Sequence, residues 1–204
     1  MWVIKLGGSW LSNPNLKKLL ELLNKFRSTP IILVVGGGIF ADAVRKSQKY
    51  LKYDDEFANY MAIKATEQYA ELINKTCPFV RVTRKYSDLL SKKNIKIWLP
   101  LKHLSRNSSY EKNWDSTSDS IACWLSNKMS SDGVIFVKSI NLKTFKDLRI
   151  KVLQKKGIID KNIIKYVKKN NSLKIIGPEV LEIIEQEKSW YNVLKKIKNI
   201  KYNL

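Results

Sequence analysis

Residues 2–8, WVIKLGG, form a short apolar run that ends in two glycines, and residues 30–38, PIILVVGGG, repeat the pattern with three. Runs of this length that are rich in Val and Ile are typical of buried strands in a parallel sheet. The chain has only eight glycines, so five of them in these two places are more than a random distribution would give. We expect two strands whose glycine-containing ends lie at one edge of the same sheet.

The rest of the chain alternates short apolar runs with longer amphipathic ones. Asn13 and Pro14 are typical of a helix cap and a first-turn proline, and leucines at helical spacing follow them. Such alternation predicts a parallel α/β sandwich with right-handed crossovers, and no linker divides it, so we expect one domain over residues 1–204. The predicted strands are 2–6, 30–35, 79–83, 96–99, 133–137 and 173–176. The later predicted helices are 39–50, 56–74, a short one marked by Ile121, Trp124 and Leu125, 157–167, 178–187 and one within 188–204.

The formal net charge of +20 invites a nucleic-acid interpretation. Lysine outnumbers arginine by 32 to 6, however, whereas base-reading and bidentate phosphate contacts favour arginine. With 22 Ile and 16 Asn beside it, the lysine excess is what an AT-rich coding bias produces. We expect no nucleic-acid partner, although a positive field favours encounters with anionic substrates.

The sequence carries no membrane or metal signature. Its longest uncharged stretch, residues 28–41, contains three glycines and falls short of the roughly 18 apolar residues that a membrane span needs. The first residues lack a basic start and a cleavage site, which predicts a cytoplasmic protein. Cys77 and Cys123 stand apart without a CxxC or Cys/His cluster, so we expect two free buried thiols and no metal ligands.

The two glycine clusters indicate anion binding. Glycine lets the backbone approach an anion and turn its N–H groups toward it, and a following helix N-terminus adds favourable partial charge. Lys5, at the end of an otherwise apolar strand, needs an anionic partner, and phosphate is the natural one. Neither GxxxxGK[ST] nor GxGxxG is present, which argues against a P-loop protein and an ordinary dinucleotide binder. A tight turn without a ligand is the simpler explanation of either cluster alone.

A third constellation is WDSTSDSIACWL, residues 114–125. Thr117 or Ser118 suits a helix cap, and Asp119 then falls in the first helical turn. A carboxylate beside lysines and phosphates either holds a lysine in place or contacts magnesium, and phosphoryl transfer uses both.

In this order and spacing, VIKLGGS, VVGGGIFADAVR and WDSTSDSIACWL resemble the amino acid kinase superfamily over roughly residues 2–140. The resemblance implies a three-layer αβα sandwich with a mainly parallel central sheet. The short chain and the patterns GGGxFADxVR and WDxTSDSxAxWL are most similar to the branch that contains the [5-(aminomethyl)furan-3-yl]methyl phosphate kinase of methanofuran biosynthesis. An ATP- and Mg²⁺-dependent kinase is thereby implied, which converts a small phosphomonoester to a diphosphate, together with a homodimer.

The resemblance also implies residue roles. Lys5 neutralises charge on the transferred phosphoryl group, and Asp119 organises the catalytic lysines. The residues implied for the ATP phosphates are Gly7, Gly8 and Ser9.

On the acceptor side, we assign Asp42 and Arg45, one turn apart after the triple glycine, to the acceptor's amine and phosphate. The resemblance itself implies that Gly36, Gly37 and Gly38 line the acceptor side. It also implies that Thr117 and Ser118 lie where related kinases contact the acceptor phosphate.

The C-terminal third departs from the superfamily pattern. FVKSIN, residues 136–141, stands where a TDVDG-like segment is usual, so Lys138 either contacts a nucleotide phosphate or is a plain strand-end lysine. Asp160 either matches an acidic position of the branch or is a turn residue. We expect an acceptor-binding half over about residues 1–130 and a shortened nucleotide-binding half over about residues 131–204.

The lone His103 favours an ordinary hydrogen-bonded role over catalysis. Three tryptophans either shape a flat pocket for a furan ring or, as is commoner for indoles, pack in the core. Trp114 is the first candidate for a ligand contact because it borders the TSDS segment. The other two are Trp98 and Trp124.

Three alternatives to the phosphomonoester kinase stay open. The first keeps the fold and takes a carboxylate acceptor, as in the aspartate and glutamate kinases, and the TSDS segment argues against it. The second is a non-catalytic nucleotide- or oxyanion-binding member of the superfamily, which the presence of Lys5 and Asp119 disfavours. A nucleic-acid-binding module comes last.

Overall fold

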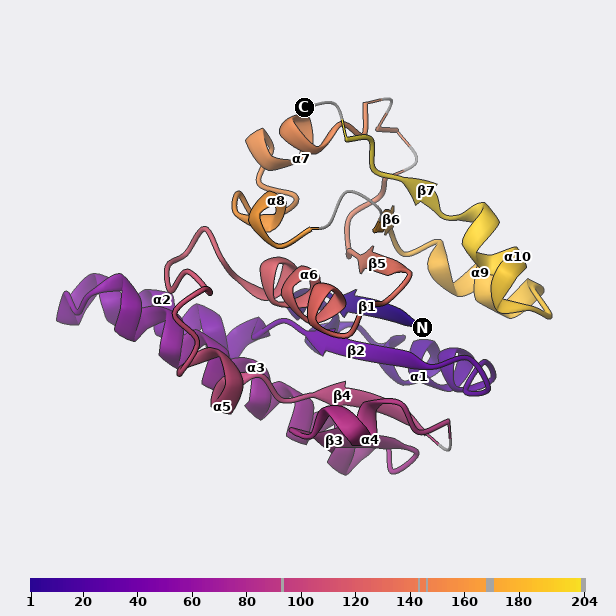
Figure 1. The fold of residues 1–204 in the computed structure, drawn as a ribbon, viewed down its shortest axis with the longest axis horizontal. Helices are drawn as coiled ribbons and strands as arrows, with labels where there is room; N and C mark the ends of the chain where they lie inside the picture. Colours follow the sequence, from indigo (N-terminus) through magenta and orange to yellow (C-terminus); the bar gives the residue numbers. More distant parts are fainter. Residues whose placement is uncertain (93, 143, 146, 168–170, 203–204) are drawn as a thin grey trace.

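The computed structural model describes residues 1–92, 94–142, 144–145, 147–167 and 171–202. Within them one sheet runs through the molecule in the order β3-β4-β2-β1-β5-β6-β7 (Figure 1). Its strands pair in parallel, except that β7 runs antiparallel to β6. The strands are β1 (Trp2–Leu6), β2 (Ile31–Val35), β3 (Val80–Thr83), β4 (Ile95–Trp98), β5 (Gly133–Val137), β6 (Ser172–Ile176) and β7 (Lys198–Asn199).

Helices connect the strands and cover both faces of the sheet. The longest is α3 (Asp55–Thr76), and α2 (Gly38–Leu51) packs beside it (Figure 1). The remaining helices are the 3-10 helix η1 (Gly8–Ser12), α1 (Leu16–Asn24), α4 (Tyr86–Leu89), α5 (Leu101–Leu104), α6 (Ser118–Lys128), α7 (Ile150–Lys155), α8 (Ile163–Tyr166), α9 (Val180–Gln186) and α10 (Trp190–Lys196).

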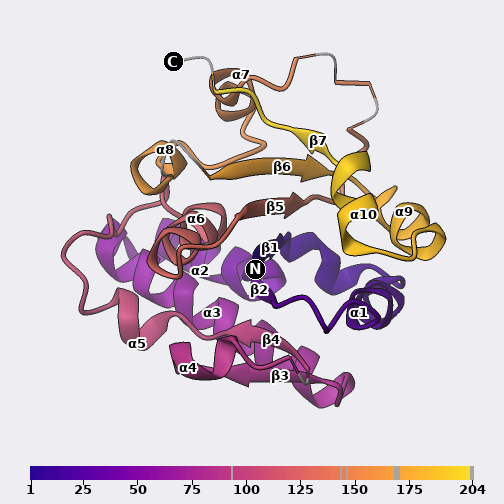
Figure 2. The same ribbon diagram turned by 45° about the vertical axis from the view of Figure 1, so that its right-hand side comes forward.

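The period of two along the strands divides the core into two layers. Ile4 and Leu6 of β1 belong to one apolar cluster with residues of α1, α3, α9 and α10. Val3 belongs to a second cluster with residues of α5, α6, α7 and α8. Figure 2 shows α1, α9 and α10 on one side of the sheet and α6 and α8 on the other. The expected three-layer αβα sandwich with a mainly parallel sheet is confirmed.

The first helix begins later than its sequence predicts. Asn13 does not cap it, because the Asn13 Oδ1 accepts the Asn15 N–H in a local turn and α1 begins at Leu16. The six predicted strands are all present within a residue or two at each end.

The short helices η1, α4 and α5 were not predicted, and further departures lie in the C-terminal third. Only Ile163–Tyr166 of the helix predicted at 157–167 is helical, and α7 and β7 were not predicted. A packed terminal helix is present as α10, with Trp190 and Val193 buried. Cys77 and Cys123 are both buried and free, as expected. No helix in the described part of the chain is long and apolar enough to cross a membrane.

Candidate active site

Two lysines reach the same side of the sheet from neighbouring strands. Lys5 follows Val3 by two residues on β1, so its side chain lies on the same face of the sheet as Val3, beneath α6. On β5 the same face carries Val134 and Phe136, and the alternation continues to Lys138 one residue past the strand. Because Lys5 pairs in register with Phe136, the two ammonium groups come together above the carboxyl ends of β1 and β5.

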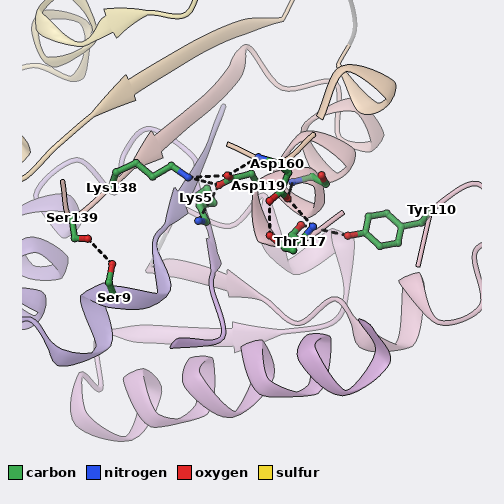
Figure 3. Close-up of polar contacts among 9 residues, drawn as sticks. Lys5, Ser9, Tyr110, Thr117, Asp119, Lys138, Ser139 and Asp160 are labelled. Carbon is green, nitrogen blue, oxygen red and sulfur yellow. Dashed lines mark hydrogen bonds and ion pairs between the residues drawn. The ribbon is translucent and has the colours of Figure 1, made fainter. Parts of the chain in front are cut away.

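Asp119 stands between the two lysines (Figure 3). Its Oδ1 lies 2.9 Å from the Lys5 Nζ, and its Oδ2 lies 2.8 Å from the Lys138 Nζ. The three side chains are 8%, 4% and 12% exposed for Lys5, Asp119 and Lys138, so this is a buried ion triad. Asp119 occupies the first turn of α6, where the helix dipole also favours a carboxylate.

The triad changes the proton affinities of its members. Burial alone would raise the pKa of Asp119, but the charges of Lys138 and Lys5 outweigh it and lower that pKa to about 2. Burial lowers the pKa of Lys138 to about 8, against the attraction of Asp119. The triad therefore carries a net positive charge near neutral pH, which is available to an anion.

Asp160 supports the triad from the loop between α7 and α8 (Figure 3). Its Oδ2 accepts the N–H groups of Thr117 and Ser120 at 2.7 and 2.9 Å, and its Oδ1 accepts the Thr117 hydroxyl at 2.6 Å. Its own N–H donates to the Asp119 Oδ2 at 3.3 Å. Burial, followed by the charge of Asp119, raises the pKa of Asp160. Thr117 is thus the N-cap residue of α6, as expected, but Asp160 supplies the capping oxygen from 40 residues away.

The two glycine bends meet at the same place. A Cβ added to Gly8 would lie 2.4 Å from the Gly38 N, and one added to Gly36 would lie 2.6 Å from the Gly8 N. Backbone at that distance leaves no room for a side chain, so glycine is required for the loops after β1 and β2 to touch. Gly38 also has a φ of +53°, which L side chains rarely adopt.

Not every glycine amide is free for a ligand. The Gly7 N–H donates to the Val137 carbonyl, and the Gly36 N–H donates to the Leu6 carbonyl. Gly8 and Gly38 are first residues of η1 and α2, whose amides have no intrahelical acceptor. The Ser9 hydroxyl lies 2.7 Å from that of Ser139, a contact between the first strand's loop and the segment after β5 (Figure 3).

A cavity of about 500 Å³ opens beside these bends and contains most of the sequence-predicted residues. Gly7, Asp119 and Lys138 are outside its lining, and the two charged ones lie behind Lys5. The predicted residues that line it are Lys5, Gly8, Ser9, Gly36, Gly37, Gly38, Asp42, Arg45, Thr117 and Ser118.

Arg45 and Trp114 form one rim of the cavity. The Arg45 guanidinium lies 4.4 Å from the centre of the Trp114 ring and 3.3 Å from the Asp42 Oδ1. The Trp114 indole N–H donates to the Gln48 Oε1 at 2.7 Å. An arginine oriented in this way presents its remaining N–H groups to an anion.

Sequence reasoning missed part of the cavity wall. Asn59, Ile63 and Thr66 of α3 line it, at positions i, i+4 and i+7 on one helix face. The sequence did contain a signal for this wall. Asn59 and Thr66 are polar residues at helical spacing on the face of α3 that also carries the buried Ile63. Asp160 was a candidate in the sequence, but its partners Thr117 and Ser120 were not predicted.

The other sequence candidates lie apart from this cavity. His103 contacts the rings of Tyr86 and Trp98, and its Nε2 donates to the Arg84 carbonyl at 2.7 Å, in agreement with the expected ordinary role. Trp98 is buried and stacks on Trp124. Of the three tryptophans, Trp114 alone lines the cavity.

The described residues do not offer a magnesium ion a ligand set of their own. They contain no cluster of three or more acidic, histidine or cysteine side chains that could hold a metal. Both oxygens of Asp119 are occupied by lysine ammonium groups, which favours the lysine-holding role over the metal role for this carboxylate.

Known proteins resemble this chain in sequence and in fold. The chain is 28% identical to the [5-(aminomethyl)furan-3-yl]methyl phosphate kinase of Methanocaldococcus jannaschii over 145 aligned residues. The aligned region covers 69% of this chain and 67% of that protein. Uridylate kinase from Archaeoglobus fulgidus has a TM-score of 0.65 at 20% identity, covering 91% of this chain and 96% of the other. UMP kinase from Ureaplasma parvum has a TM-score of 0.61 at 15% identity, covering 91% and 94%. Both of these solved structures support the fold alone.

The match to a family model extends over β1 to β5. Residues 1–141, more than half of the chain, match the model described as "Amino acid kinase family", and this kinase therefore belongs to the amino acid kinase family.

Proposed function

We propose that this kinase transfers the γ-phosphoryl group of ATP to a small phosphomonoester and releases a diphosphate and ADP. The observation that carries the proposal is the buried Lys5–Asp119–Lys138 triad beside two touching glycine bends. A site that joins two phosphate-bearing molecules must first cancel their repulsion, and fixed positive charge with backbone N–H groups does this.

The chain's own groups suffice for the remaining steps. A monoester phosphate loses its second proton near pH 6, so one of its oxygens is already a nucleophile near neutral pH. It attacks the γ-phosphorus, the bond from that phosphorus to the β,γ-bridging oxygen breaks, and ADP leaves. Lys5 and Lys138 stabilise the charge on the moving group, and no covalent intermediate on the protein is needed.

The two halves of the chain divide the substrates in this proposal. The cavity lined by Gly37, Arg45 and Trp114 takes the acceptor, with the Arg45 guanidinium toward its phosphate. ATP then approaches from the side of Ser9 and Lys138, where β5 and the residues after it contribute to the site.

The candidate acceptor is [5-(aminomethyl)furan-3-yl]methyl phosphate. The related Methanocaldococcus jannaschii protein is named for this molecule. Its flat ring and single phosphate suit a cavity of about 500 Å³ with Trp114 at the rim.

A panel assay tests the proposal. Purified protein is incubated with magnesium, labelled ATP and, separately, the furan phosphate, UMP, aspartate and N-acetylglutamate. We expect a labelled diphosphate from the furan phosphate. An acyl phosphate from a carboxylate, trapped with hydroxylamine, or ATP binding without turnover on any acceptor, would contradict it.

A further inference from the structure

One wall of the cavity contains a buried oxygen without a partner. Asn59 is 2% exposed, and its side-chain Nδ2 donates to the backbone carbonyls of Asn113 and Ser116 at 2.9 and 3.0 Å. Carbonyls only accept, so these two bonds fix which end of the amide is nitrogen. The Asn59 Oδ1 has no hydrogen-bond partner among the described residues. A buried carbonyl oxygen left in this way is destabilising, which a ligand donor would relieve.

Two threonines on the same wall have already committed their protons. The Thr66 hydroxyl donates to the Ile63 carbonyl at 2.8 Å, and the Thr117 hydroxyl donates to the Asp160 Oδ1 at 2.6 Å. Each hydroxyl oxygen therefore has only lone pairs left for a further partner. With its proton committed, the Thr117 hydroxyl does not suit the acceptor phosphate that the resemblance implies for it. Asn59 and Thr66 lie on one face of α3, and Thr117, which precedes α6, lines the same cavity next to Ser116, whose carbonyl Asn59 contacts. This wall accepts hydrogen bonds, whereas Lys5 and Arg45, which also line the cavity, donate them.

We propose that this acceptor wall, made of Asn59, Thr66 and Thr117, is a subsite for a protonated primary amine on the acceptor molecule. The inference deepens the proposed function and rests on it. An ammonium group has three N–H donors and no acceptor, which matches a wall that offers only oxygen lone pairs. The nearby Asp42 carboxylate also lines the cavity and favours a positive charge there.

The arrangement predicts an acceptor with opposite charges at its two ends. Its phosphate lies toward Lys5 and Arg45, and its ammonium group lies toward the acceptor wall. The two cations that line the cavity are already held by carboxylates, Lys5 by Asp119 and Arg45 by Asp42, which reduces their repulsion of the ammonium group. An analogue without the donor would leave the wall unpaired, and sites built to pair a polar group reject such analogues strongly.

Three phosphomonoesters on one furan scaffold test the inference. They carry an aminomethyl, a hydroxymethyl or an ethyl group at the same ring position, and the ethyl group has nearly the shape of the protonated amine. We expect kcat/KM to be about 100-fold or more higher for the amine than for the ethyl compound, with the alcohol between them. Equal kcat/KM for the amine and ethyl compounds would overturn the inference and leave the proposed function intact.

Binding measured by calorimetry without ATP distinguishes a failure of the proposed function from a failure of the amine subsite. If none of the three compounds is phosphorylated, the proposed function fails, and the order of their dissociation constants still tests the subsite. Tighter binding of the amine by the same factor supports the subsite, whereas equal binding, or no binding of any of them, overturns it.

Variants locate the effect on the wall. Thr66→Val keeps the side-chain shape and removes the oxygen, and we expect it to reduce the amine-to-ethyl ratio by about tenfold. Thr76→Val is its matched control, because Thr76 makes the same kind of bond to a helix carbonyl at the far end of α3. Asn59→Leu should reduce the ratio similarly if its melting shows a folded protein. A wild-type ratio in folded Thr66→Val would remove Thr66 from the subsite, and a wild-type ratio in both variants would overturn the inference.

Discussion

The carboxyl ends of β1 and β5 deliver the same group to the same place in different sequence contexts. Lys5 is followed by a glycine bend that belongs to a recognisable motif, whereas Lys138 is followed by Ser139 and Ile140 without one. Both ammonium groups nevertheless pair with Asp119. The comparison teaches that strand period and register, not the local motif, place a charged side chain in this sheet.

The contacts that hold the two regions in place also differ. The β1 region is held by close backbone contact between Gly8 and Gly38, which involves no side chain. The C-terminal region is joined to the site by side-chain bonds over long sequence distances, above all from Asp160 to Thr117. Substitutions that act on one support and not on the other test this difference.

The largest effect is expected where both regions meet, at Asp119. Asp119→Asn leaves two buried ammonium groups without their countercharge, and we expect unfolding free energy to fall by about 3–5 kcal/mol. Urea denaturation measures it. The control is Asp147→Asn, which breaks an exposed pair with Arg149 and should lower the unfolding free energy far less. Equal losses in the two variants would contradict the buried triad.

Asp160→Asn tests the C-terminal support alone. The amide keeps one oxygen but turns an N–H₂ group toward donors of Thr117 or Ser120, so we expect a loss of about 3 kcal/mol in unfolding free energy. Chemical denaturation with kinetics on the folded variant checks it. Asp115→Asn, in a more exposed pair with Lys161, is the control. A loss no greater than the control's would mean that the Asp160 contacts contribute little.

Gly8→Ala tests the β1 support. Its Cβ would meet backbone of Gly38 at 2.4 Å, so the two loops must separate, at a cost of roughly 1–3 kcal/mol. Gly7→Ala is the matched control, because its Cβ would meet the Val137 carbonyl oxygen at the milder distance of 3.3 Å. Thermal melts of both variants should rank them in this order, and the reverse ranking would contradict the close contact.

A pH profile examines Lys138 by itself. Burial lowers the pKa of its ammonium group to about 8, so the group loses its proton as pH rises through that value. We expect kcat/KM to fall by up to about tenfold per pH unit above pH 8. Lys138→Arg should move this decline to higher pH, because a guanidinium stays protonated. A wild-type profile that is flat to pH 9.5 would exclude an essential Lys138 ammonium group.

The fold was largely predictable from the sequence because its strands are short apolar runs with clear ends. Lys5 and the glycines were predicted for the same reason, since each lies at or just after a strand end, whereas Arg45 was predicted from its place one turn after Asp42 on the helix that follows the triple glycine. The contacts of Lys138 and Asp160 were not predictable, because they depend on which distant segments the sheet order brings together. Asn59 was overlooked although its position on the buried face of α3 was readable from the helical period.

The C-terminal elements show the same limit. The strand β7 has two residues, Lys198 and Asn199, both exposed, so no apolar pattern marks it. Its pairing with β6 is set by the preceding helix α10, which packs through Trp190 and Val193. Tertiary packing, not local propensity, determines such a short strand.

The most direct test of the triad is the kcat of Lys5→Met, measured with saturating ATP, magnesium and the acceptor identified by the panel assay, against Lys17→Met on the exposed face of α1 as control. We predict a kcat lower by roughly 10²–10³-fold for Lys5→Met, as for the loss of one preorganised charge donor, and no change for the control. A folded Lys5→Met protein with kcat within threefold of the wild type would contradict the account.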